Sequence, residues 1–122
     1  MPEQTKINSF KDLIVWQKSF QLVRQIYKIT EKIPSTEMYG LKSQMQRSSV
    51  SIPSNIAEGF YRRTPKDFKQ FLHIAFGSTA ELETQLLLCK ELYSINIEEE
   101  GKLLTEVSKM LRVFITKLET KD

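Results

Sequence analysis

The chain of 122 residues has an ordinary globular composition, with 40% hydrophobic and 27% charged residues. A chain of this length can bury one hydrophobic core, so we expect residues 1–122 to form a single domain, with residues 1–9 as a flexible arm. Four glycines and four prolines are too few for a loop-rich or all-β architecture. The first residues lack an apolar signal core, and no apolar run approaches the ~18 residues of a membrane span. We therefore expect a cytoplasmic protein that makes no membrane contact.

The net charge of +3 is unevenly distributed along the chain. Residues 1–80 hold twelve Lys/Arg and six Asp/Glu, a net charge of +6, whereas residues 81–122 hold six and nine, a net charge of −3. A basic portion of this kind is suited to a polyanionic partner, while the acidic portion faces elsewhere.

The first helix is predicted from Ser9 to Ile33, because Asp12 follows Ser9 at capping-box spacing and Pro34 ends the segment. Its apolar residues form two adjoining rows, Leu13, Trp16, Phe20, Val23 and Tyr27 in one and Leu22, Ile26, Ile29 and Ile33 in the other. A helix in a lone bundle needs only one apolar stripe. The extra row predicts another neighbour, and we expect self-association, because a monomer would leave Ile26 and Ile29 bare.

Three more helices follow, separated by turn signals. The second is predicted to begin with Ser35 or Thr36 as its cap and to run to about Glu58. The third begins at Thr64-Pro65, a cap followed by proline at the first helical position, and runs to about Leu92. Glu98 to Glu100 crowd the first turn of the fourth, where acids are favourable. Connections this short predict an all-α, antiparallel up-down four-helix bundle.

A row of short polar side chains runs along one face of the second helix, where long charged side chains would be typical of a solvent face. Small residues between Ala75 and Ala80 suggest the matching surface on the third helix. We interpret this row as a polar seam between the two helices, with Arg47 reaching Glu81 or Glu58, and Asn55 bonding across to the region of Ser78. The predicted seam comprises Arg47, Ser48, Ser51, Asn55, Glu58, Ser78 and Glu81.

No catalytic or metal-binding constellation is present in the sequence. One histidine, His73, and one cysteine, Cys89, cannot form a zinc site without recruiting carboxylates, and Cys89 lies in an apolar run typical of a buried thiol. A nucleophile, base and orienting group would need more than this inventory. We expect a protein that is not an enzyme and that binds no metal and no cofactor.

The best candidate for binding is a basic cluster at the turn between the second and third helices, Arg62, Arg63, Lys66 and Lys69. It follows Phe60 and Tyr61, so the cluster could contact phosphates and a stacked base. The alternative interpretation is a solvated turn followed by a lysine-rich surface.

Several segments carry a resemblance to a known family: RSSVSIPSNIAEG from Arg47 to Gly59, FKQFLHIAFGSTAELE from Phe68 to Glu83, and Tyr39-Gly40-Leu41. The chain resembles small bacterial four-helix bundle proteins, which include proteins encoded in intervening sequences of large-subunit ribosomal RNA genes. They also include the accessory variability protein of diversity-generating retroelements. Nearly the whole chain takes part in this resemblance.

The resemblance implies an up-down bundle that assembles as a ring-like homopentamer. For the retroelement members it also implies nucleic-acid binding and work with a reverse transcriptase. The leading hypothesis is therefore a non-enzymatic oligomeric scaffold that binds RNA or DNA weakly and without sequence preference. The alternative is a protein-interaction module for a co-encoded partner such as a reverse transcriptase, with no direct nucleic-acid role.

Overall fold

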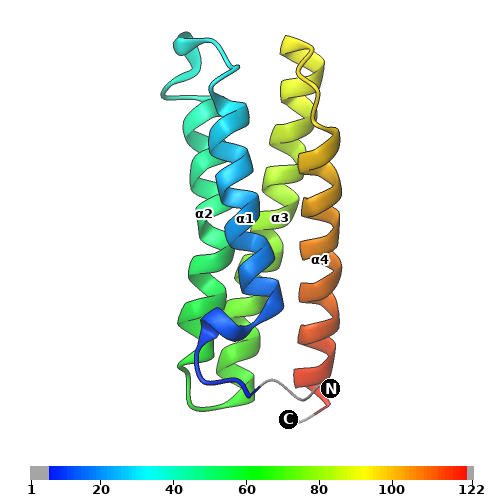
Figure 1. Cartoon of the computed structure of the whole chain (residues 1–122). Helices are drawn as coiled ribbons and strands as arrows, with labels where there is room; N and C mark the ends of the chain where they lie inside the picture. The colour runs from blue at the N-terminus through cyan, green and yellow to red at the C-terminus, as the bar shows by residue number, and fades with distance from the viewer. Residues whose placement is uncertain (1–5, 121–122) are drawn as a thin grey trace.

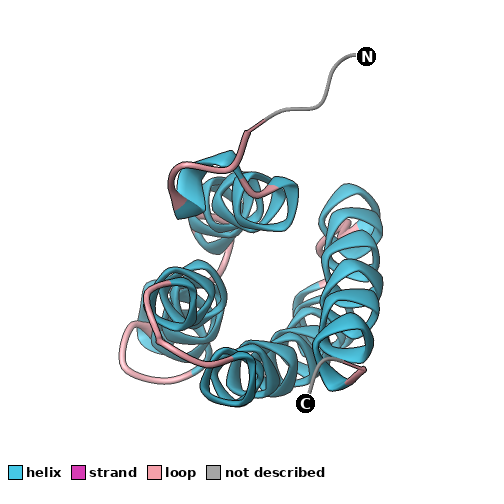
Figure 2. Cartoon of the chain, turned by 90° about the horizontal axis from the view of Figure 1, so that it is seen from below, coloured by secondary structure: helices cyan, strands magenta, loops and turns pink. Residues whose placement is uncertain are grey.

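The protein is a bundle of four long helices, described over residues 6–120 by a computed structural model (Figure 1). Each helix packs against the next in the chain, and the first also packs against the last, so that they surround one core in chain order (Figure 2). The predicted all-α four-helix bundle is confirmed. None of the helices in this part of the chain is long and apolar enough to cross a membrane. The helices are α1 (Ile14–Thr30), α2 (Leu41–Phe60), α3 (Pro65–Tyr93) and α4 (Glu98–Glu119), with two short 3-10 turns, η1 (Phe10–Asp12) and η2 (Ser35–Glu37).

One of the two apolar rows on α1 lies in the core of the single chain. Leu22 and Ile26 are fully buried, whereas Phe20 and Tyr27 of the other row are exposed. The expectation that a monomer leaves Ile26 and Ile29 bare is therefore wrong. Both rows have helical spacing, so the sequence pattern alone did not distinguish the inner from the outer row. The row that the single chain leaves partly exposed is the aromatic one.

The capping box predicted at Ser9 is present, but it starts the short turn η1. The Ser9 hydroxyl accepts a hydrogen bond from the Lys11 N–H at 3.0 Å, and the Asp12 carboxylate accepts from the Ser9 N–H at 3.1 Å. Leu13 is extended (φ −77°, ψ 126°), so α1 begins only at Ile14. Asp12 also accepts from the Asn8 N–H at 2.8 Å, so the end of the expected flexible arm is held in place. The rest of that expectation, for residues 1–5, lies outside the described residues.

The expected start of the second helix at Ser35 or Thr36 is wrong, because those residues form η2 and α2 begins at Leu41. The cap position is held by Gly40, which has no side chain to accept a bond. Glu37 takes that role from four residues away: its carboxylate accepts from the Leu41 N–H at 3.2 Å. The same carboxylate accepts a hydrogen bond from the hydroxyl of Tyr93, at the end of α3. Glu37 therefore ties the start of α2 to the end of α3.

We expect Glu37→Gln to lower the melting temperature at pH 7, with the difference from wild type shrinking in acid. The hydrogen bond from Tyr93, followed by that from the Leu41 N–H, lowers the pKa of Glu37 below 4.5. A carboxyl group whose pKa is lower in the folded chain than in the unfolded chain stabilises the fold at pH values above its unfolded-state pKa. This stabilisation is lost as pH falls through the folded-state pKa. Melting curves by circular dichroism at pH 7 and at pH values below 4.5 test this.

Tyr93→Phe provides the matched control for that measurement, because it removes the other half of the same hydrogen bond. The double variant should be less destabilised than the sum of the two single variants, since both remove one interaction. A Glu37→Gln difference that stays constant down to acid pH would contradict the assignment.

The starts predicted for the last two helices are confirmed. The Thr64 hydroxyl accepts from the Asp67 N–H at 3.1 Å, and Pro65 occupies the first helical position of α3. Glu98 to Glu100 lie in the first turn of α4. Between these helices, Ser94 adopts a left-handed conformation (φ 55°), and its N–H donates to the Lys90 carbonyl at 3.0 Å. This cap ends α3 one residue beyond the predicted end.

Candidate functional site

The predicted basic cluster lies at the turn between α2 and α3. This turn shares one end of the bundle with η1 and with the C-terminal end of α4 (Figure 1). Thr64 and Pro65 fix the start of α3 and thereby place Arg63 just before the helix and Lys66 in its first turn. The positive end of the helix dipole adds to these charges and favours anions.

The four basic side chains of the cluster have different surroundings. Arg62 forms an ion pair with Glu58 at 2.8 Å, and its guanidinium carbon lies 4.6 Å from the centre of the Phe71 ring. Arg63 and Lys66 are exposed and have no hydrogen-bond or ion-pair partner among residues 6–120. Lys69 is half-buried on α3. Arg63 and Lys66 are therefore the cations best placed to bind an external anion.

The charge of the whole bundle is polarised in the same direction. The basic end, defined as residues 6–22, 51–78 and 108–120, holds ten Lys/Arg and four Asp/Glu, a net charge of +6. The opposite end, residues 23–50 and 79–107, holds seven Lys/Arg and nine Asp/Glu, a net charge of −2. Antiparallel packing thus gathers cations that are far apart in the sequence. The potential of the folded chain favours approach of a polyanion to this end.

The predicted polar seam makes two hydrogen bonds between α2 and α3. The Ser78 hydroxyl donates to Ser51 Oγ at 2.8 Å, and the Ser48 hydroxyl donates to Gln85 Oε1 at 2.7 Å. Asn55 does not bond directly to the region of Ser78 as expected. Its amide donates to the carbonyl and hydroxyl oxygens of Ser51, at 2.8 and 3.0 Å. The link from Asn55 to α3 therefore passes through Ser51.

The predicted ion pair of Arg47 is wrong. Arg47 is exposed and has no carboxylate partner within residues 6–120, while Glu58 pairs with Arg62 instead. Glu81 is exposed on α3. Side chains of Arg47 and Glu81 line an open polar groove of about 580 Å³ between the two helices. We also expected the small residues of α3 to pack closely against α2. This is wrong for Gly77, where an added Cβ would have no atom within 4 Å.

Cys89 is a fully buried thiol in contact with Met45, whose sulfur lies 3.3 Å from its own. Burial, followed by the nearby charge of Glu37, raises the pKa of Cys89 to about 11, so the unreactive thiol form dominates at neutral pH. His73 is exposed on α3. Among residues 6–120, no three His, Cys, Asp or Glu side chains gather in a group able to hold a metal ion.

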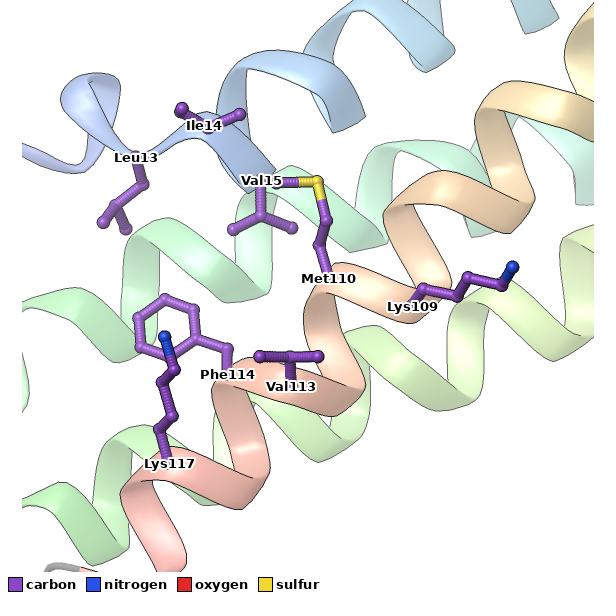
Figure 3. Close-up of a pocket in the computed structure, with 8 residues that line it drawn as sticks. All are labelled: Leu13, Ile14, Val15, Lys109, Met110, Val113, Phe114 and Lys117. Atoms are coloured by element: carbon purple, nitrogen blue, oxygen red, sulfur yellow. The ribbon is translucent and has the colours of Figure 1, made fainter.

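An apolar groove of about 440 Å³ lies between the start of α1 and the last turns of α4 (Figure 3). Ile14 and Val113 are 58% and 54% exposed there, although both are large apolar side chains. Lys109 and Lys117 extend from the α4 side of the groove. Sequence reasoning missed this groove, because it depends on how α1 packs against α4. The apolar side chains that line it are Leu13, Ile14, Val15, Met110, Val113 and Phe114.

Comparison with known proteins agrees with this architecture. A sequence model of the 23S rRNA-intervening sequence protein family matches residues 11–115. The chain belongs to this family. A solved structure from Bacteroides thetaiotaomicron, described as a protein with unknown function from the S23 ribosomal protein family, is 27% identical in sequence. It aligns with a TM-score of 0.75 over 84% of this chain and 98% of the other. No curated protein matched the chain.

The part of the chain that matches the 23S rRNA-intervening sequence protein family takes in the basic turn and the polar seam. It also takes in most of the apolar groove, whose lining residue Lys117 falls just beyond it. All three surfaces therefore belong to the family domain itself.

Proposed function

We propose that this member of the family is a non-enzymatic, oligomeric scaffold that binds nucleic acid through the phosphate backbone without sequence preference. The charge polarity of the bundle carries this proposal, since the basic end has a net charge of +6 and presents Arg63 and Lys66 without acidic partners among the described residues. Lys and Arg contacts to phosphates supply the sequence-independent part of nucleic-acid affinity.

Self-association with copies of the same chain belongs to the proposal. Phe20 and Tyr27 on α1 and the groove beside Ile14 leave apolar surface open on the bundle. Extended apolar patches on soluble proteins mark interaction sites. A ring of five copies is the assembly that the family resemblance implies.

The first test removes charge at the basic end and measures the salt dependence of binding. We expect Arg63→Gln with Lys66→Gln to weaken binding to any RNA or DNA, and to reduce the slope of log affinity against log salt by about 1.4 to 1.8 for the two phosphates lost. Fluorescence anisotropy between about 50 and about 200 mM salt gives both quantities.

Lys28→Gln with Lys32→Gln is the matched control, because it removes two exposed cations at the opposite end of the bundle. It should leave the slope nearly unchanged. Equal losses in the two double variants would show that binding follows net charge alone. Absence of binding at low salt would refute the nucleic-acid role and favour a protein-interaction module for a co-encoded partner.

A further inference from the structure

Aromatic rings from three parts of the chain meet at the basic end. Phe10 of η1 lies edge-on to Trp16 of α1, with ring centres 5.1 Å apart, and edge-on to Tyr61 at 6.0 Å. Tyr61 also contacts Phe60 at 5.2 Å. Trp16 continues the row by stacking on Phe20 at 5.0 Å. Folding of η1 against the α2–α3 turn thus joins rings that are some fifty positions apart in the sequence.

Tyr61 is the open member of this row. Its side chain is 65% exposed, whereas Phe10, Trp16 and Phe60 are half-buried. Contacts with Phe10 and Phe60 hold the ring without covering it. Exposure of an aromatic ring to water is unfavourable. Because neighbouring rings hold Tyr61 in place, another flat apolar group could stack on it at little cost in order.

The cations next to Tyr61 define what that group is. Arg62 is engaged by Glu58 and Phe71, but Arg63 and Lys66 are unpaired within residues 6–120 and follow Tyr61 within five positions. An aromatic ring beside cations that track a phosphate backbone is the combination used to bind single-stranded nucleic acid.

We propose that Tyr61 stacks an unpaired base while Arg63 and Lys66 bind the neighbouring phosphates, so that the protein prefers single strands to duplexes. This inference rests on the proposed nucleic-acid binding and adds the class of ligand and the residue that selects it. Bases in a duplex are stacked on one another and are not available to Tyr61, whereas duplex phosphates remain accessible to the cations.

The test compares Tyr61→Ala with Tyr61→Phe on a labelled single strand of about 20 nucleotides and on the matching duplex. Loss of one stacked base should weaken single-strand binding roughly 5- to 150-fold and leave duplex binding and the salt slope unchanged. Tyr61→Phe keeps the ring and should retain the affinity of wild type. Circular dichroism of both variants serves to check that they are folded.

Tyr39→Ala is the matched control, since Tyr39 is 94% exposed at the opposite end of the bundle and should tolerate the change without loss of affinity. Trp16, the only tryptophan, is linked to Tyr61 through the ring of Phe10, which contacts both. Its fluorescence should therefore change when the single strand binds. Unchanged single-strand affinity in Tyr61→Ala, or equal affinity of wild type for strand and duplex, would overturn the inference while leaving phosphate binding intact. Absence of binding to either would refute the proposed function as well.

Discussion

Replacing Gly59 with alanine is expected to destabilise the bundle, although alanine is the better helix former. A Cβ at this position of α2 would lie 2.8 Å from the Phe71 Cβ and from the Phe68 ring, and 3.2 Å from the Phe68 carbonyl oxygen. The ring could turn away, but the Phe71 Cβ and the carbonyl move only with the backbone of α3. Overpacking of this kind costs about 1 to 3 kcal/mol, which offsets or outweighs the ~1 kcal/mol gained from helix propensity.

Two other helical glycines provide matched controls with the opposite sign. A Cβ added at Gly77 or Gly101 would have no atom within 4 Å. Gly77→Ala and Gly101→Ala should therefore stabilise the protein by up to about 1 kcal/mol. Urea unfolding of the three variants gives the free energies directly. If Gly59→Ala were as stable as Gly77→Ala, the close approach of α2 and α3 would be refuted.

The features predicted correctly from the sequence are those that depend on neighbouring residues. Thr64 and Pro65 mark the start of α3 because a cap and a proline act within one turn. The glutamates from Glu98 mark the start of α4 for the same reason. Helical spacing of apolar residues then gave four helices, and short connections made neighbours antiparallel.

The features that sequence reasoning missed depend on contacts between distant segments. The start of α2 relies on Glu37, whose carboxylate accepts from the Leu41 N–H and also from the Tyr93 hydroxyl at the distant end of α3. In the same way, the partner of Ser48 is Gln85, which no local pattern indicates. Gly59 and Gly77 look alike in sequence, yet only the first meets another backbone.

The sequence indicates the basic turn, but it does not indicate which of its side chains lack partners in the folded chain. Four cations within eight positions indicated an anion site. Folding separates them, because Arg62 is engaged by Glu58 and Phe71 while Arg63 and Lys66 remain open. Phe60 and Tyr61 were equivalent neighbours in the sequence, and packing leaves Tyr61 the more exposed of the two.

A second exposed apolar surface lies on α3, away from the apolar groove between α1 and α4. Exposed Leu87 and Leu92 lie on α3 near the acidic residues Glu83 and Glu91 and the single cation Lys90, whereas the groove has lysines at its rim. Two different surfaces that bind each other form a head-to-tail contact, and such contacts close into a ring when the rotation between neighbouring copies allows it. We therefore propose a second copy of the chain as the occupant of the groove. The groove lies at the basic end and the leucines at the other, so the bundles would have to be tilted relative to the axis of the ring.

The last prediction is that Val113→Glu breaks the assembly without unfolding the chain. Light scattering coupled to size exclusion should give wild type a mass of five times the chain's 14.3 kDa, and the variant the mass of one chain. Val113 is 54% exposed within the chain, and glutamate is at least as good a helix former, so the monomer should keep its fold. At the interface the new carboxylate would be buried among apolar side chains and close to the acidic surface of the neighbour, which opposes association.

Thr36→Glu is the control for this prediction, because it adds the same charge to the exposed turn η2 and should leave the wild-type mass unchanged. A different closed oligomer for wild type would discard only the number five, whereas a wild-type monomer at micromolar concentration would refute the contact.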